Sequence, residues 1–350
     1  MLLLKWHLFN YSKLEMNELQ YITIQNFTTS TGKAHTINLS YQTFGKALHT
    51  APIVLVNHAL TGNSNVIGKD GWWNDLIGIN KCIDTNNYTI IAFNIPGNGF
   101  DNNLENLIED YKNFTAKDVA KLFSIALDLL KIEQLFAVIG GSVGGGLAWE
   151  LAVLKPNLIQ HLIPIATDWK STDWIIANCH IQDAILNNST EPLADSRMHA
   201  MTLYRTPESL AQKFARTKKN DSLYNVESWL NYHGDNLNNR FNLSAYKMMN
   251  QVLKTIDISD GEKDFLEVAS AISSDIHIIT INSDLFFKAE ENWNAYVDLK
   301  SIKDNVNIHE IKSIHGHDAF LIEFDQLARF LKPIFKVELK TNKTLNKQVA

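Results

Sequence analysis

Short runs of apolar, mostly β-branched residues alternate with amphipathic stretches in the first half of the chain. The predicted strands span residues 52–57, 88–94, 134–139 and 159–166. These runs are almost continuously apolar and end at turn residues, as expected for strands of a parallel sheet covered on both faces. Residues 115–130 carry apolar side chains on one face of a predicted helix. The alternation predicts an α/β fold with a mostly parallel sheet flanked by helices.

A long polar segment interrupts this pattern. Residues 167–269 are rich in Asn, Asp and Lys and have helical character, so we expect an inserted helical cap. The strand pattern resumes after Asp275 and again at residues 306–311, and a last helix is expected near residues 325–331. The catalytic domain is therefore predicted to comprise residues 16–166 and 270–337.

The two ends of the chain are expected to lie outside that domain. Residues 1–15 are a candidate non-native extension, with Met16 as the alternative start, and residues 338–350 resemble a polar tail. Lys5 and His7 interrupt the apolar opening, which leaves it shorter than the core of a signal peptide. No stretch reaches the roughly 18 apolar residues of a membrane span.

Composition narrows the possible partners and the location. The formal charge is -6, from 32 basic and 38 acidic residues, so no basic excess is available to neutralise nucleic acid. The only cysteines, Cys82 and Cys179, do not have the spacing of a disulfide framework or a metal site. We therefore expect a cytoplasmic protein without a bound metal and without a nucleic-acid or membrane partner.

The strongest chemical motif is the stretch Gly140-Gly141-Ser142-Val143-Gly144, which follows one predicted strand and begins a helix. This is the G-x-S-x-G pattern of a nucleophile elbow, in which a tight turn lifts the serine hydroxyl clear of the sheet. Small residues at 140 and 144 are needed because side chains there would collide across the turn. The alternatives are a glycine-rich turn of no chemical consequence and a dinucleotide-binding loop, but for the second Trp149 stands where the third glycine belongs.

A nucleophilic serine needs a histidine as base and an acid that orients it, and on this fold the order along the chain is Ser, acid, His. Asp284 follows the strand after Asp275, and His317 lies in a glycine-containing loop after residues 306–311. Asp275 and Asp304 are rival acids, and His315 is the rival base.

An oxyanion hole would complete this site. Its donors are expected to be the backbone N–H groups of Val143, the residue after the nucleophile, and Leu60, in the loop after an early strand. His58 is expected to hold that loop.

Several separate stretches resemble the homoserine O-acetyltransferase family of methionine biosynthesis. They include NHALTGNS at 57–64, IGGSVGGGLAWELA at 139–152, INSDLFF at 281–287 and HGHDAFLIE at 315–323. The resemblance extends over most of the chain and implies an α/β-hydrolase fold, with Ser142, Asp284 and His317 as its catalytic triad. It also implies acetyl-CoA as cosubstrate, homoserine as acceptor, no bound cofactor, and a homodimer formed through the cap.

The same resemblance extends to the acceptor site, because residues 197–205 are similar to the family's substrate-contacting helix. Arg197 and Tyr204 are seven apart, which puts them on one helix face, so that both could reach an amino-acid carboxylate. Asp318 matches the family residue that meets the substrate ammonium group. From the residues alone, an ordinary solvated helix face would be the preferred interpretation of Arg197 and Tyr204, and the family resemblance reverses that preference.

Other functions remain open from the sequence. Serine as acceptor or succinyl-CoA as donor would use the same triad, and so would a hydrolase of small esters. A catalytically inactive fold member that serves as a binding or scaffold protein is a further alternative. Val143, where the family usually has methionine, and the shorter loop after Asn94 are departures from the family pattern.

Overall fold

A large sheet forms the centre of the protein. The computed structural model describes residues 18–68, 70–261 and 263–336, so the predicted extension and tail lie outside the described residues. The strands are β1 (Gln20–Thr28), β2 (Ala34–Gly45), β3 (Ile53–Asn57), β4 (Ile77–Gly78), β5 (Ile83–Asp84), β6 (Thr89–Phe93), β7 (Leu135–Gly141), β8 (Ile159–Ile165), β9 (Asp275–Ile281) and β10 (Val306–Ile311).

Eight strands make up the main sheet, in the order β1-β2-β6-β3-β7-β8-β9-β10, and β4 and β5 form a separate pair. β2 pairs antiparallel with both of its neighbours, and the remaining pairings are parallel. From β3 the chain moves to β6 on one side and later to β7 on the other. The switch point of the topology therefore lies between β3 and β7, where α/β sheets usually bind their ligands.

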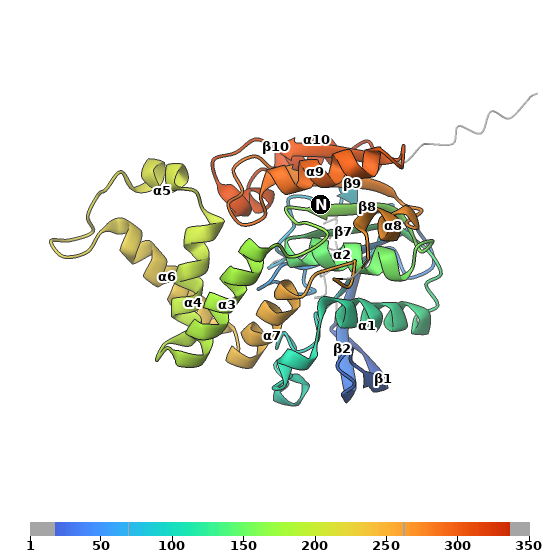
Figure 1. Ribbon diagram of the computed structural model, residues 1–350, viewed down its shortest axis with the longest axis horizontal. Helices are drawn as coiled ribbons and strands as arrows, with labels where there is room; N and C mark the ends of the chain where they lie inside the picture. Colours follow the sequence, from blue (N-terminus) through green and yellow to red (C-terminus); the bar gives the residue numbers. More distant parts are fainter. Residues whose placement is uncertain (1–17, 69, 262, 337–350) are drawn as a thin grey trace, which may run out of the picture.

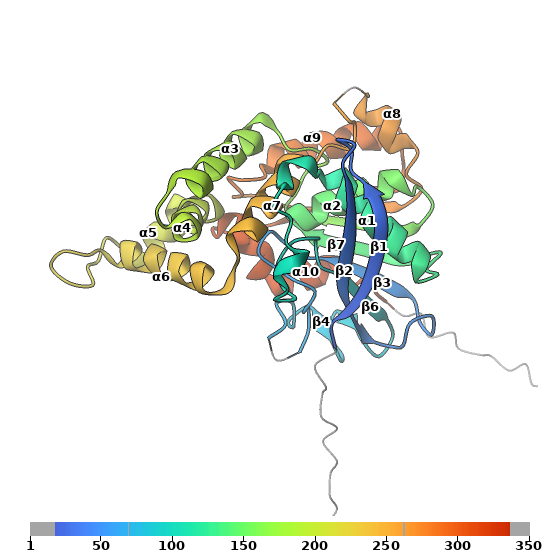
Figure 2. The same ribbon diagram turned by 90° about the horizontal axis from the view of Figure 1, so that it is seen from below.

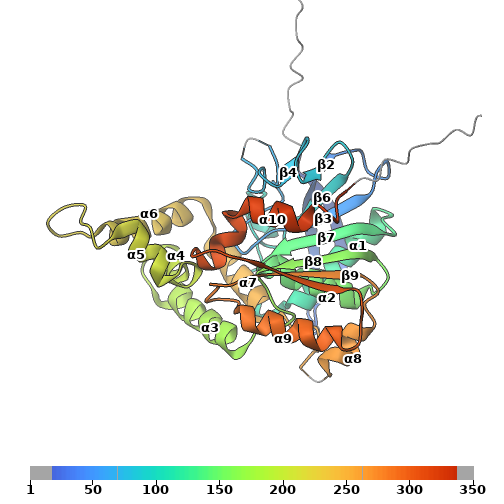
Figure 3. The ribbon, with the colours of Figure 1, turned by 90° about the horizontal axis from the view of Figure 1, so that it is seen from above.

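Helices cover both faces of the sheet. They are α1 (Ala116–Leu129), α2 (Val143–Leu154), α3 (Asp173–Asn188), α4 (Pro192–Tyr204), α5 (Pro207–Phe214), α6 (Asn225–Arg240), α7 (Leu243–Lys254), α8 (Phe265–Ser270), α9 (Ala289–Lys300) and α10 (Phe324–Leu331), together with the short 3-10 helices η1 (Leu104–Asn106), η2 (Tyr111–Asn113) and η3 (Gly316–Leu321). Figure 3 shows α10 on one side of the sheet and α2, α8 and α9 on the other.

Side chains of the sheet alternate between two hydrophobic cores. On β3, Ile53 and Leu55 belong to the core shared with α1, α2 and α9, whereas Val54 and Val56 belong to the core shared with α10. A strand that is buried on both faces has no solvent-exposed positions for polar side chains, which explains the continuous apolar runs in the sequence.

The α/β-hydrolase fold class is confirmed, and β3, β6, β7, β8 and β10 lie where strands were predicted. The hairpin of β1 and β2 was not predicted. Only two residues of β1 are buried, and a register shift between Ile24 and Phe27 interrupts the alternation of apolar and polar residues that would mark a strand.

The helical segment between β8 and β9 contains α3 to α8. Helices α3 to α6 project from one end of the sheet, with α7 between them and the body of the protein (Figures 1 and 2). α8, in contrast, lies beside α9 at the far side of the sheet (Figure 1). We use "cap" below for α3 to α7; the predicted cap limits of 167 and 269 stay a prediction.

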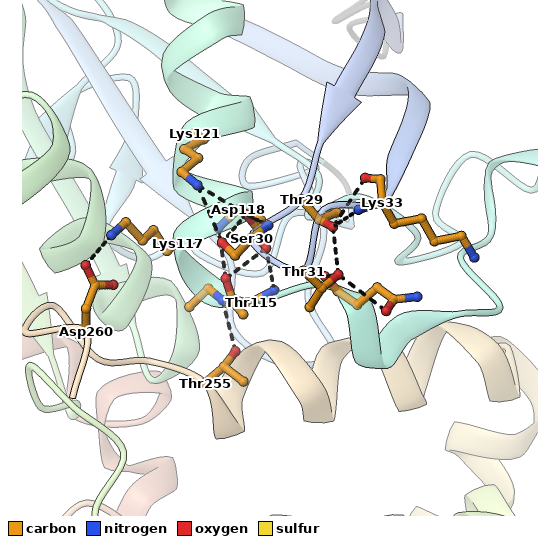
Figure 4. A network of polar contacts seen from close by, with 12 residues as sticks. Thr29, Ser30, Thr31, Lys33, Thr115, Lys117, Asp118, Lys121, Thr255 and Asp260 are labelled. Atoms are coloured by element: carbon orange, nitrogen blue, oxygen red, sulfur yellow. Dashed lines mark hydrogen bonds and ion pairs between the residues drawn. The ribbon is translucent and has the colours of Figure 1, made fainter. Parts of the chain in front are cut away.

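One buried carboxylate ties the β1–β2 turn to the start of α1. Asp118 Oδ1 accepts hydrogen bonds from Ser30 N at 2.9 Å and Ser30 Oγ at 2.6 Å, and Oδ2 accepts from Thr115 N at 3.1 Å and Thr115 Oγ1 at 2.9 Å (Figure 4). Thr115 is the N-cap of α1, and this pair forms a capping box. A neighbouring hydrogen bond, from Ala116 N to Thr255 Oγ1 at 2.9 Å, connects the start of α1 to the end of α7, the last helix of the cap.

Asp118→Asn should destabilise the protein by about 2–4 kcal/mol, because the amide keeps one acceptor oxygen and sets an NH₂ group against two donors. Urea unfolding measures the loss. The matched control is Asp128→Asn, which removes an ion pair to Lys155 from a carboxylate that is 63% exposed and should cost less than about 1 kcal/mol. Equal losses in the two variants would contradict the role given to Asp118.

Candidate active site

Ser142 lies at the turn between β7 and α2 in a backbone conformation that side-chain-bearing residues rarely adopt. Its φ is +57° and its ψ is -129°. A Cβ on Gly140 would lie 2.4 Å from the carbonyl carbon of Gly144, and one on Gly144 would lie 2.5 Å from the carbonyl oxygen of Asn57. The structure therefore confirms that a side chain at either glycine would collide with the backbone, and at Gly144 the collision would be with the end of β3. Asn57 also donates from Nδ2 to Gly144 O at 3.1 Å.

Asp284 and His317 form a hydrogen-bonded pair beyond the ends of β9 and β10. His317 Nδ1 lies 2.7 Å from Asp284 Oδ2, and the two side chains are 5% and 0% exposed. The other carboxylate oxygen, Oδ1, accepts from Phe286 N at 2.7 Å and Phe287 N at 2.9 Å. Asp284 is thus held by its own turn and can fix the tautomer in which His317 Nδ1 carries a proton, leaving Nε2 as the base.

Aromatic rings surround the His317 imidazole. The rings of Phe286, Tyr204, Phe287 and Phe320 have centroids 5.3 to 5.7 Å from that of His317. Phe320, on η3, also packs against the elbow, because a Cβ on Gly141 would lie 2.4 Å from its ring. The 3-10 helix that carries His317 therefore rests on the turn that carries Ser142, in surroundings with little water.

Two backbone N–H groups are available for an oxyanion. Among the described residues, neither Leu60 N nor Val143 N has a hydrogen-bond partner. Val143 is the first residue of α2, so its N–H points out of the helix beside Ser142. Both residues are at least nine-tenths buried, which suits donors that act in a low-dielectric site.

His58 fastens the loop that contains Leu60. Its Nδ1 donates to Ala59 O at 2.8 Å, and its Nε2 accepts from Ile95 N at 2.9 Å. Burial lowers the pKa of His58 to about 4, so the ring is neutral and keeps this tautomer at physiological pH. On the cap side, Arg240 Nη1 donates to Thr61 O at 3.1 Å.

The predicted acceptor residues lie on the cap and on η3. The guanidinium of Arg197 is 5.8 Å from the centre of the Tyr204 ring, and both residues are on α4. Arg197 forms no ion pair with any described residue. Asp318 follows His317 directly, and its Oδ2 lies 3.7 Å from Arg205 Nη1. Burial raises the pKa of the Tyr204 hydroxyl, so it stays protonated and can donate.

The rival acids and base lie elsewhere. Asp275 is at the amino end of β9, 3.6 Å from His161, and Asp304 precedes the amino end of β10. Both are at the opposite ends of these strands from the catalytic loops. His315 Nδ1 accepts from Arg205 Nη2 at 3.0 Å and lies 3.2 Å from Ser209 Oγ, so it faces the cap.

A pocket lies close to the active site, and two of its lining residues, Tyr204 and Phe286, pack against the His317 ring. It runs between the oxyanion loop and helices α3, α4 and α7, and it is lined by Leu60, Asn178, Cys179, Gln182, Ala200, Leu203, Tyr204, Tyr246, Asn250, Leu253 and Phe286. Asn178, Tyr246 and Asn250 were not predicted from the sequence, where nothing distinguishes them from other cap residues. The hydrogen bonds from the Phe286 and Phe287 N–H groups to Asp284 could have been predicted, because an aspartate at a turn often accepts from the N–H groups of the residues that follow it.

The residues that the structure describes include no group of three or more His, Cys, Asp or Glu side chains placed to hold a metal ion. None of the described helices is both long and apolar enough to cross a membrane.

Comparisons with known proteins agree with this geometry. A model of the α/β-hydrolase fold family matches residues 52–302. A homoserine O-acetyltransferase of Methanococcus vannielii is 34% identical over an aligned region that covers 87% of this chain and 70% of that relative. The chain belongs to the homoserine O-acetyltransferase family. It is accordingly an acyltransferase of the α/β-hydrolase fold.

Solved structures show the same fold at lower identity. The homoserine O-acetyltransferase of Bacillus anthracis is similar with a TM-score of 0.84 at 18% identity, covering 93% of this chain and 99% of that one. An esterase, E22, is similar with a TM-score of 0.82 at 17% identity, covering 92% of this chain and 100% of that one. The family fold therefore occurs in transferases and esterases alike, and the acceptor must be argued from the residues of the site.

Asp284→Asn should lower kcat by about 10³- to 10⁴-fold, because an amide in place of Oδ2 would favour the wrong tautomer of His317. Acyl-transfer kinetics with any substrate of the wild-type enzyme measure the loss. Asp304→Asn, at the other end of the sheet, is the control and should keep full activity. If the two variants were equally active, Asp284 would not be the residue that orients the base.

Proposed function

We propose that the protein transfers an acetyl group from acetyl-CoA to the hydroxyl of homoserine, through an acyl-serine at Ser142, as a step of methionine biosynthesis. The observation that carries the proposal is the position of Arg197. This cation has no described ion-pair partner and lies over Tyr204, whose ring is 5.4 Å from that of His317. A site for a carboxylate thus adjoins the base that would activate an acceptor.

The first half-reaction forms the acyl-enzyme. His317 Nε2 takes the proton of Ser142 Oγ as the oxygen attacks the thioester carbon. The backbone N–H groups of Leu60 and Val143 donate to the oxyanion that develops. When the tetrahedral intermediate collapses, the carbon–sulfur bond breaks, and the CoA thiol leaves with the proton from His317.

The second half-reaction returns the enzyme to its starting state. His317 Nε2 now takes the proton of the homoserine hydroxyl, and that oxygen attacks the acyl-serine carbonyl. The ester bond to Ser142 breaks, and the proton passes to Ser142 Oγ. The hydrogen bond from Nδ1 to Asp284 stabilises the imidazolium that forms in both steps.

The charges around the pocket suit a zwitterionic acceptor. Arg197 and the Tyr204 hydroxyl can bind a carboxylate, and the Asp318 carboxylate can bind an ammonium group. Both charges of the acceptor would then be held while its hydroxyl meets His317, which contributes through proximity and orientation.

Four mixtures test the proposal: acetyl-CoA or succinyl-CoA as donor, each with homoserine or serine as acceptor, followed by thiol release. We expect turnover to be fastest with acetyl-CoA and homoserine, with parallel double-reciprocal lines as the acceptor is varied. Without an acceptor, a burst of about one thiol per Ser142 should appear. Ser142→Ala should abolish the burst and the turnover. Faster turnover with serine or succinyl-CoA would replace the proposed substrates and leave the acyl-serine chemistry in place.

Arg197→Ala separates a transferase from an esterase. It should lower kcat/KM for homoserine by about 100-fold or more, because a charge-assisted contact to the carboxylate is lost. Hydrolysis of the neutral ester p-nitrophenyl acetate should change little. Arg216→Ala, at an exposed cap arginine over Tyr224, is the control and should behave as wild type in both assays. Equal losses on both substrates in Arg197→Ala would contradict the carboxylate site.

A further inference from the structure

Residues 204–209 of the cap contact the catalytic histidine loop, residues 312–318. Thr206 Oγ1 donates to Ile314 O at 2.5 Å. A Cβ on Gly316 would lie 2.7 Å from Tyr204 O, and Gly316 has a φ of +65° that favours glycine. The loop that carries His317 and Asp318 can therefore approach the C-terminal end of α4 closely.

Arg205 occupies the centre of this contact. Its Nη2 donates to Ser209 Oγ at 3.0 Å and to His315 Nδ1 at 3.0 Å, and its Nη1 lies 3.7 Å from Asp318 Oδ2. The Arg205 side chain is 12% exposed. A planar guanidinium with fixed donor directions can serve all three groups at once, which a lysine ammonium cannot do.

Asp318 is engaged on one side only. Arg205 faces Oδ2, whereas Oδ1 has no hydrogen-bond partner among the described residues. Burial raises the pKa of Asp318, and the positive charges of Arg197 and Arg205 oppose that shift. The ion pair with Arg205 thus helps to keep the carboxylate ionised and attracts Oδ2 toward the guanidinium, while the second oxygen stays available to a cation.

We propose that Arg205 is a positioning residue for the acceptor: it orients Asp318 so that the free carboxylate oxygen meets the acceptor's ammonium group. This inference rests on the proposed function and adds a residue that the sequence left unassigned. Arg205 then acts in the second half-reaction, in which the acceptor binds, and not in the formation of the acyl-serine.

Arg205→Gln should raise KM for homoserine by about 10- to 100-fold, because Asp318 loses its ion pair and no longer holds the acceptor's ammonium group as well. The value of kcat should change by less than about threefold. The thiol burst from acetyl-CoA should keep its rate within about twofold. With 4-hydroxybutyrate, which has the carboxylate and hydroxyl but no ammonium group, wild type and variant should be alike. Arg205→Lys, which keeps the charge and loses the fork, should give an intermediate KM.

A double variant tests whether Arg205 acts through Asp318. In an Asp318→Asn background, Arg205→Gln should change KM for homoserine by less than about twofold, because the group it orients has lost its charge. Arg216→Gln is the matched control and should leave every value unchanged. Should Arg205→Gln fail to fold, Arg205→Lys and its double variant provide the same comparison.

Three results would overturn the inference: an unchanged KM in Arg205→Gln, a thiol burst that slows as much as the overall reaction, or losses that simply add in the double variant. The second would mean that Arg205 only supports the His317 loop. Absence of homoserine acetylation by the wild type would instead refute the proposed function, so the two failures can be told apart.

Discussion

The backbone conformation of Ser142 is the constraint on which the site depends. For a residue with a side chain, this combination of φ and ψ raises the free energy of the folded state by about 1–3 kcal/mol, which the surrounding packing must offset. Gly140, Gly144 and the end of β3 interlock around the turn with no room for a Cβ at either glycine. Because β3 and β7 pair at this point, the oxyanion loop and the nucleophile are set by the same sheet register.

The second requirement is that the cap and the catalytic loops hold each other. Arg240 reaches Thr61 in the oxyanion loop, and Arg205 reaches His315 and Asp318 in the histidine loop. Asp284, by comparison, needs only its own turn and His317. Asp284 is thus fixed at the end of β9, whereas the segment that carries both His317 and Asp318 is held by contacts between the cap and the sheet.

The sequence predicted what local patterns determine. Buried strands such as β3 and β6 appear as apolar runs, and the Ser142 elbow has a fixed order of small residues. Asp284 and His317 followed from strand ends, which meet at one edge of a parallel sheet. The exposed β1 has no such pattern. The role of Arg205 depends on residues 110 positions away, and no rule of periodicity or spacing relates residues that far apart.

The point at which the cap enters the fold has a further consequence. It leaves the sheet after β8 and returns at β9, and these two strands are direct neighbours. Because β8 and β9 run parallel, the inserted segment leaves at the edge of the sheet that carries the catalytic loops and returns, through α8, at the opposite edge. Helices α3 to α7 all precede that return. Evolution can lengthen, trim or exchange that module without altering the strand register, so a lineage could acquire a new acyl acceptor while inheriting its bond-breaking apparatus intact.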